Sequence, residues 1–157
     1  MEENKEKTVK KRQECNPAYQ WHIQDLYASD EAWEKDYESL MSEIHSLAAY
    51  EGRLKEGSEV FVEYMRKKEA LMKKFEAIYV YANQRLHENT DNSTYQNLAS
   101  QAQGLLVELS ESLSFVEPEL MELPDGIIET FLDENEELSV YRQYFENIIR
   151  QKKHVLP

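Results

Sequence analysis

The sequence predicts an all-α protein, an antiparallel helical bundle of about five helices arranged around one long central helix. Three observations support this fold class. Apolar residues recur at spacings of three, four and seven through most of the 157 residues, which is the period of one helix face. Glycine and proline are few, with four of each, as expected where helices are joined by short connections. The third observation is the length of one periodic stretch, residues 58–88.

Residues 58–88 are predicted to form a single amphipathic helix that serves as the spine of the bundle. A helix of this length extends about 45 Å. Lys68 falls inside the apolar arc and is expected to direct its ammonium group outward, past the edge of the core. The apolar members of the arc are Phe61, Tyr64, Met65, Leu71, Met72, Phe75, Ile78, Tyr79, Ala82 and Leu86.

A shorter helix is predicted before the spine, starting after Ser29 and running to about Tyr50. Ser29 suits an N-cap position, and Gly52 suits the left-handed residue beyond a helix end. Ser58 is expected to cap the spine. The short connection between the two helices favours antiparallel packing. The apolar stripe of this first helix comprises Trp33, Tyr37, Leu40, Met41, Ile44, Leu47 and Ala48.

Three further helices are predicted after the spine. The cluster HENTDNST ends the spine, and a third helix follows it and must stop near Pro118, because proline disfavours a helical conformation in the preceding residue. EPELMELP is expected to be an acidic connector about one short turn long. GIIETFLDEN is expected to form a short fourth helix, and a fifth begins at about Glu136.

The chain divides into a short arm and one domain. Residues 1–17 are charged and non-periodic, which is typical of a flexible N-terminal arm. Residues 18–157 form a single helical domain in this interpretation. Its first segment is the aromatic stretch YQWHIQDLY at residues 19–27, which is expected to pack against the bundle in extended form.

The net charge of −13 argues against a nucleic-acid surface, because phosphate binding needs clustered Lys and Arg. No apolar run is long enough to predict a membrane-spanning helix. Cys15 is the only cysteine, so the sequence offers no disulfide framework and favours a reducing, cytoplasmic environment. No Lys or Arg occurs between Arg85 and Arg142. This acidic interval is either a solvated face or a surface that attracts cationic peptides.

A search for catalytic or metal-binding groups identifies no site residues. The four histidines are His22, His45, His87 and His154, and no two of them are four residues apart, the spacing of an H-E-x-x-H zinc motif. A metal site at His87, Glu88 and Asp91 is conceivable, but helix-end and capping roles explain these residues better. The sequence also lacks a nucleophile elbow and a glycine-rich phosphate loop. We therefore predict no catalytic, cofactor-binding or metal residue in this chain.

Five stretches, taken in order and spacing, resemble the N-terminal domain of oligoendopeptidase F. They are WHIQDLYASDEAW, AAYEGRL, YVYANQRLHENTDNSTYQNLASQA, SFVEPELMELP and YRQYFENIIRQKKHVL. The resemblance covers residues 19–156, nearly the whole chain. Each stretch alone is mostly helix and turn chemistry, and the specificity comes from their order.

The resemblance implies part of a cytoplasmic zinc metalloendopeptidase that cleaves short peptides in a deep cleft between mostly helical halves. In that family the zinc ligands and general base lie on an H-E-x-x-H helix towards the C-terminus, and no such motif occurs here. The expected role is a substrate-channel wall that admits oligopeptides, with the chain truncated before its partner, the catalytic domain. A further hypothesis is that the acidic stretch from Glu108 to Glu137 favours cationic peptides.

Two other readings remain open. The first is a free-standing helical module that binds a protein or peptide in a groove lined by Tyr64, Met65, Met72 and Tyr79, although such a stripe is usually core. The second is an autonomous enzyme. The channel-wall interpretation also predicts an exposed apolar face where the catalytic domain would dock, and such a face is able to drive self-association.

Overall fold

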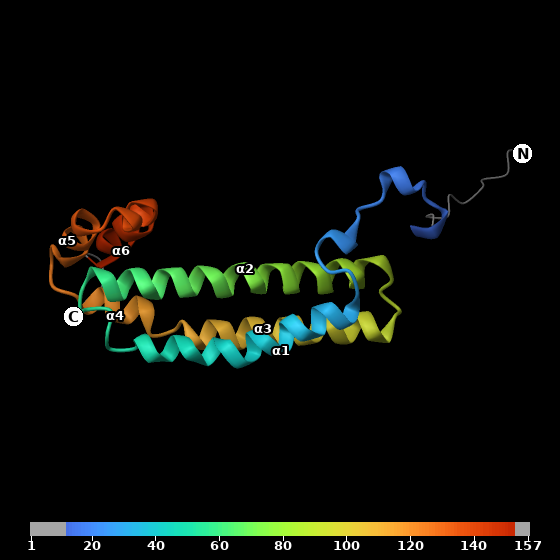
Figure 1. The fold of residues 1–157 in the computed structure, drawn as a ribbon, viewed down its shortest axis with the longest axis horizontal. Helices are drawn as coiled ribbons and strands as arrows, with labels where there is room; N and C mark the ends of the chain where they lie inside the picture. The colour runs from blue at the N-terminus through green and yellow to red at the C-terminus, as the bar shows by residue number, and fades with distance from the viewer. Residues whose placement is uncertain (1–11, 153–157) are drawn as a thin grey trace, which may run out of the picture.

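Three long helices lie side by side and form the body of the protein (Figure 1). The structure, a computed structural model, describes residues 12–152. Successive helices run antiparallel, and the central one packs against both neighbours. They are α1 (Asp30–Ile44), α2 (Ser58–Glu88) and α3 (Ser93–Ser112). The 31 residues of α2 are the predicted spine.

Short helices gather at one end of this body, near the beginning of α2 (Figure 1): α4 (Val116–Glu122), α5 (Ile127–Glu134) and α6 (Arg142–Lys152). Short 3₁₀ segments connect the helices or precede them: η1 (Arg12–Glu14), η2 (Pro17–Tyr19), η3 (Ile23–Asp25), η4 (His45–Tyr50) and η5 (Glu136–Tyr141). No residue between 12 and 152 forms a strand. The predicted all-α class is confirmed.

One apolar core runs through the bundle and continues under the short helices. Trp33 of α1 has no exposed surface, and its indole N–H donates a hydrogen bond of 2.9 Å to the carbonyl oxygen of Ile78. At the other end, the Phe61 ring lies 5.1 Å from the ring of Phe145 and 6.1 Å from that of Phe131. These contacts fix α5 and α6 on the first turns of α2.

The start of α1 and the bounds of α2 agree with the sequence prediction, whereas the end of α1 and the cap of α2 do not. The Ser29 hydroxyl accepts a hydrogen bond of 3.3 Å from the Ala32 amide, as an N-cap does. The α-helix ends at Ile44, and the predicted continuation is the 3₁₀ segment η4, in which Ala48 is exposed. Ser58 does not cap α2. Gly57 holds the N-cap position, and the Ser58 hydroxyl donates to the Glu134 carboxylate.

Lys68 lies inside the apolar arc of α2, as predicted. Its side chain is half-buried, and the ammonium nitrogen sits 5.2 Å from the centre of the Tyr144 ring. The ring of this α6 residue therefore provides a cation–π contact in place of full hydration. Burial lowers the pKa of the Lys68 ammonium group, although neighbouring Glu69 acts in the opposite direction.

The third helix is shorter than predicted, and the connector after it is longer. α3 ends at Ser112, and the first six residues of EPELMELP belong to α4, of which Pro118 is the third residue. Proline is tolerated there because the amides of the first turn have no partner inside the helix. The fifth predicted helix also starts late, because residues 136–141 form η5 before α6 begins.

The aromatic segment at residues 19–27 is not extended, and it packs only in part. η2 and η3 curl it into 3₁₀ turns. Ile23 and Tyr27 are buried, whereas Tyr19 and Trp21 are almost fully exposed. Of the predicted flexible arm, residues 1–11 lie outside the described part of the chain, and residues 12–17 form η1, the turn after it and the first residue of η2.

Candidate functional site

The conceivable metal site at the end of α2 is an ion-pair cluster. Glu88 lies 2.7 Å from the Arg85 guanidinium and 2.6 Å from that of Arg12. Its carboxylate therefore has two cationic partners, while His87 and Asp91 are exposed. Within residues 12–152 no group of three or more His, Cys, Asp or Glu side chains is placed to hold a metal ion.

The other histidines also stand apart from one another. His22 lies 2.7 Å from Asp25 on the exposed N-terminal segment. His45 is exposed at the start of η4. His154 lies outside the described residues.

Arg85 joins three helices at one end of the bundle. Its guanidinium lies 4.2 Å from the Tyr95 ring of α3 and 3.3 Å from the Asp30 carboxylate at the start of α1. Asp30 also accepts a hydrogen bond of 2.6 Å from the Tyr81 hydroxyl. Arg85 and Asp30 are both only partly exposed, so this pairing is worth more than a surface ion pair. Its evident role is structural, because it fixes the ends of α1, α2 and α3 together.

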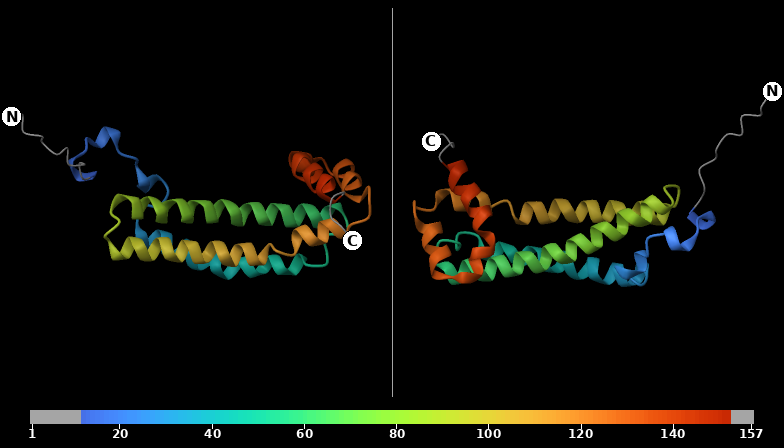
Figure 2. Two further views of the ribbon diagram at one scale, coloured as in Figure 1. Left: turned by 180° about the vertical axis from the view of Figure 1, so that it is seen from behind. Right: turned by 90° about the horizontal axis from the view of Figure 1, so that it is seen from above.

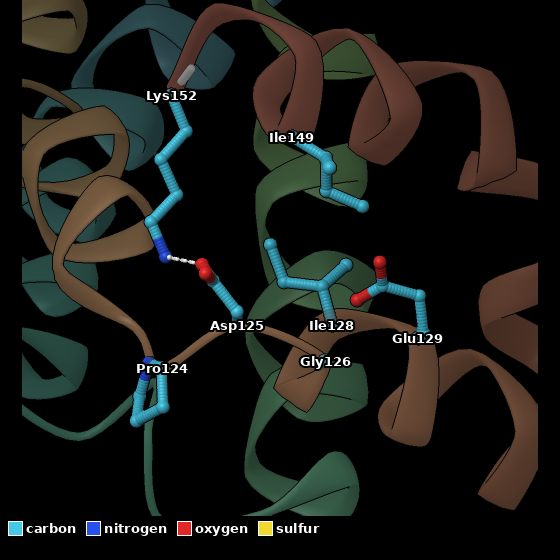
Figure 3. Close-up of a pocket in the computed structure, with 7 residues that line it drawn as sticks. All are labelled: Pro124, Asp125, Gly126, Ile128, Glu129, Ile149 and Lys152. Atoms are coloured by element: carbon cyan, nitrogen blue, oxygen red, sulfur yellow. Dashed lines mark hydrogen bonds and ion pairs between the residues drawn. The ribbon is translucent and has the colours of Figure 1, made fainter.

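A small hollow of about 370 Å³ lies between the start of α5 and the end of α6 (Figure 3). Lys152 reaches across its mouth to Asp125, at 2.8 Å, and also donates to the carbonyl oxygen of Leu123. Ile128 and Ile149 face each other and form the apolar wall. Because the Lys152 ammonium group is already paired, we interpret this hollow as part of the structural contact between α6 and the turn before α5.

A larger hollow of about 640 Å³ lies beside the N-terminal segment, at the last turns of α2. Tyr19 and Trp21 line one side of it, and Gln84 and His87 of α2 line the other. This hollow was not predicted, because the aromatic segment was expected to pack onto the bundle. Two aromatic rings, separated by one residue in the sequence, are exposed here. This region is therefore the main candidate for a binding surface.

The four residues of the alternative peptide groove do not line one common surface. Tyr64 has no exposed surface and Met65 is 4% exposed. Met65 and Met72 border a shallow hollow of about 380 Å³ with Tyr141 and Tyr144, but Tyr64 and Tyr79 do not line it. Met72 and Tyr79 are partly buried against the core. The residues proposed for the groove are thus mainly interior, as helical stripes usually are.

Comparison with known proteins finds similarity to oligopeptidases of the F type. A family model described as Oligopeptidase F matches residues 119–157. Oligopeptidase PepF of Bacillus subtilis is 29% identical over 155 residues, which cover 99% of this chain and 23% of that protein. Group B oligopeptidase PepB of Streptococcus agalactiae is 32% identical over 145 residues, covering 92% of this chain and 24% of that protein.

Solved structures agree with the sequence matches. The crystal structure of oligoendopeptidase-F from Enterococcus faecium aligns with a TM-score of 0.71 and 32% identity, covering 82% of this chain and 25% of that one. This chain matches the N-terminal domain of oligoendopeptidase F. A putative peptidase from Chlamydophila abortus, 24% identical with a TM-score of 0.76 over 96% of this chain and 25% of that one, shares the fold.

The chain spans about a quarter of the length of the curated relatives it matches. The resemblance read from the five sequence stretches is therefore confirmed. The larger part of such a peptidase has no counterpart among these 157 residues. Among residues 12–152, no helix combines the length and the apolar character needed to cross a membrane.

Proposed function

We propose that this chain is the non-catalytic wall of the peptide-binding cleft in a zinc metalloendopeptidase that acts on short peptides. The supporting observation is the match of 99% of this chain to 23% of oligopeptidase PepF. In this proposal residues 18–157 form the wall domain. The zinc, its ligands and the general base belong to the remainder of the enzyme, which is this domain's partner.

The architecture suits a wall that acts by its shape. α2 extends about 45 Å and is packed along its length against α1 and α3. The Arg85 network locks one end of the bundle, and the Phe61 ring cluster locks the other. A stiff wall of this kind limits access to narrow, unfolded oligopeptides and excludes folded proteins.

We further place the enzyme in the cytoplasm, without a nucleic-acid or membrane partner. The support is compositional: the chain has a single cysteine and a net charge of −13. Neither feature suits a disulfide-stapled secreted domain or a phosphate-binding surface.

The proposed function is tested by a chimeric enzyme in which this chain replaces the matched quarter of Bacillus subtilis oligopeptidase PepF. The expected result is zinc-dependent cleavage of short peptides by the chimera, and none by this chain alone with added zinc. The measurement is cleavage of a fluorogenic peptide. Metal-dependent cleavage by the purified 157-residue chain would contradict the proposal, as would a folded chimera without activity.

The acidic stretch from Glu108 to Glu137 is proposed to favour cationic peptides. Several of its carboxylates already have partners, because Glu137 pairs with Arg66 and Asp125 with Lys152. The bias is therefore expected to be modest, and salt should weaken it. Cleavage rates of Lys-rich and Glu-rich peptides by the chimera at low and high salt measure it. Equal rates for both peptides at low salt would end this part of the proposal.

A further inference from the structure

The side chains of Tyr19 and Trp21 are unusually exposed for large aromatic residues. Their side chains are 86% and 83% exposed, the highest values for large apolar residues within the described part of the chain. Rings of this size carry about 150–250 Å² of surface each. Two of them lining one hollow approach the size of patch that marks an interaction site.

The segment that carries these rings is held in a defined conformation. Gln20, between them, donates hydrogen bonds to the carbonyl oxygens of Arg12, at 2.9 Å, and Cys15, at 2.8 Å. Arg12 donates to the Trp21 carbonyl oxygen at 2.7 Å and pairs with Glu88 of α2. A preformed segment loses little conformational entropy on binding, so its rings are suited to act as anchors.

The exposed surface continues from these rings onto α2. Gln84 lines the same hollow as Tyr19 and Trp21. Val80, one helical turn earlier, is 43% exposed. The N-terminal segment lies at one end of α2 and the α5–α6 pair at the other, on the same side of the helix (Figure 2). The outer face of α2 is the strip between them.

We propose that Tyr19, Trp21, Val80 and Gln84 form a docking edge, covered by the catalytic part of the enzyme with Trp21 as the central anchor. This proposal rests on the proposed function. The relatives of this chain are about four times longer than the chain itself. Because the matched part is N-terminal, the rest of each relative follows the equivalent of α6. A partner that leaves α6 and reaches Trp21 has to lie along the outer face of α2.

Charge argues against a second copy of this chain as the occupant. Each copy carries a net charge of −13, so two copies meeting through the same face repel each other. The docking edge itself is made of aromatic, aliphatic and amide side chains. It is suited to a partner surface that is apolar at its centre.

The test compares the isolated chain with the chimeric PepF enzyme by hydroxyl-radical footprinting and mass spectrometry. Trp21 is expected to be oxidised about fivefold more slowly in the chimera, because a partner would bury the ring as an anchor. Trp33, with no exposed surface, provides the internal reference and should stay protected in both. Equal oxidation of Trp21 in both proteins would overturn the proposal, and the same graft in the Enterococcus faecium enzyme provides a second host.

Trp21→Ala adds a measurement that does not depend on labelling. In the isolated chain its melting temperature should match that of the wild type, because the ring contacts little. In the chimera the melting temperature should fall by about 2 °C or more. Val107→Ala, at an exposed α3 position, is the matched control and should change neither. An equal effect of Trp21→Ala in both proteins would contradict the proposal.

Two further outcomes are distinguishable. Peptide cleavage by the chimera reports on the proposed function, whereas the protection of Trp21 reports on the docking edge. An inactive chimera with a protected Trp21 would support the docking edge and contradict the proposed function. Sedimentation of the isolated chain tests whether a second copy of this chain covers the docking edge. A dimer that the Trp21→Ala substitution dissociates would show that it does, and would overturn the proposal.

Discussion

At the scale of single residues, the two tryptophans show how differently one side-chain type is used. Trp33 is completely buried and makes a hydrogen bond to α2 through its indole N–H. Trp21 is 83% exposed on the N-terminal segment. Burial of the Trp33 ring removes apolar surface from water and so stabilises the fold. The second contributes little to the isolated fold and is available for binding.

Replacing Trp33 with alanine is expected to destabilise the protein by about 3–5 kcal/mol, because the change leaves a large cavity at the α1–α2 interface. Trp21→Ala, the matched control, should change the unfolding free energy by no more than about 0.5 kcal/mol. Urea denaturation followed by circular dichroism measures both. Similar midpoints for the two variants would show that Trp33 is not part of the core.

Tyr64 is a residue whose polar atom opposes its burial. Its side chain is fully buried, and its hydroxyl has no hydrogen-bond partner. Tyr64→Phe is therefore expected to raise the unfolding free energy by about 1 kcal/mol, since an unsatisfied buried hydroxyl carries a desolvation cost. Tyr81→Phe should lower it by about 1–2 kcal/mol, because the Tyr81 hydroxyl donates to Asp30. Urea midpoints that move in the same direction for both variants would contradict this assignment.

At the scale of elements, the differences from the sequence prediction lie where a tertiary partner decides the local structure. The Ser58 hydroxyl meets Glu134 of α5 instead of capping α2, and sequence alone does not show that α5 lies there. Val62 is likewise buried although it falls outside the predicted arc. The helix stripes themselves were predictable, since their spacing reflects one buried face.

The carboxylate of Glu119 links α4 to the connection before α2. It accepts hydrogen bonds of 2.8 Å from the Gly52 amide and 2.7 Å from the Leu54 amide. Glu119→Ala is expected to cost about 2 kcal/mol of stability, because hydrogen bonds to a charged group are lost and the Leu54 amide is partly buried. Glu122→Ala, an exposed position on the same helix, is the control. Urea denaturation should separate the two variants, and equal stabilities would exclude the link.

At the scale of the whole molecule, the properties that could be predicted from the sequence are those set by the pattern and order of its residues. The all-α class, the 31-residue spine and the family resemblance follow from periodicity and from the order of the five stretches. The docking edge was not predictable in the same way. Tyr19 and Trp21 are large aromatic residues of the kind found in protein cores. Only the fold shows that the bundle leaves them uncovered.

The buried tyrosines predict how the whole domain responds to alkaline solution. Burial is the main cause that raises the pKa of Tyr27, Tyr64, Tyr81 and Tyr144 in the folded state. Tyr141, which is partly exposed, has a pKa raised to about 12, with burial and a hydrogen bond to Glu69 as the first causes. In the unfolded chain, tyrosine ionises near pH 10.

Because the unfolded state releases these protons first, the tyrosines contribute full stability below pH 10 and lose it progressively as the pH rises towards the folded pKa values. The unfolding free energy is therefore expected to fall steadily above pH 10. Tyrosinate absorbance during an alkaline titration should rise in step with the loss of helical circular dichroism. Tyr81→Phe should flatten the fall, because it removes one of the shifted groups. A stability that stays constant between pH 10 and pH 12 would show that these hydroxyls ionise as readily in the folded state as in the unfolded chain.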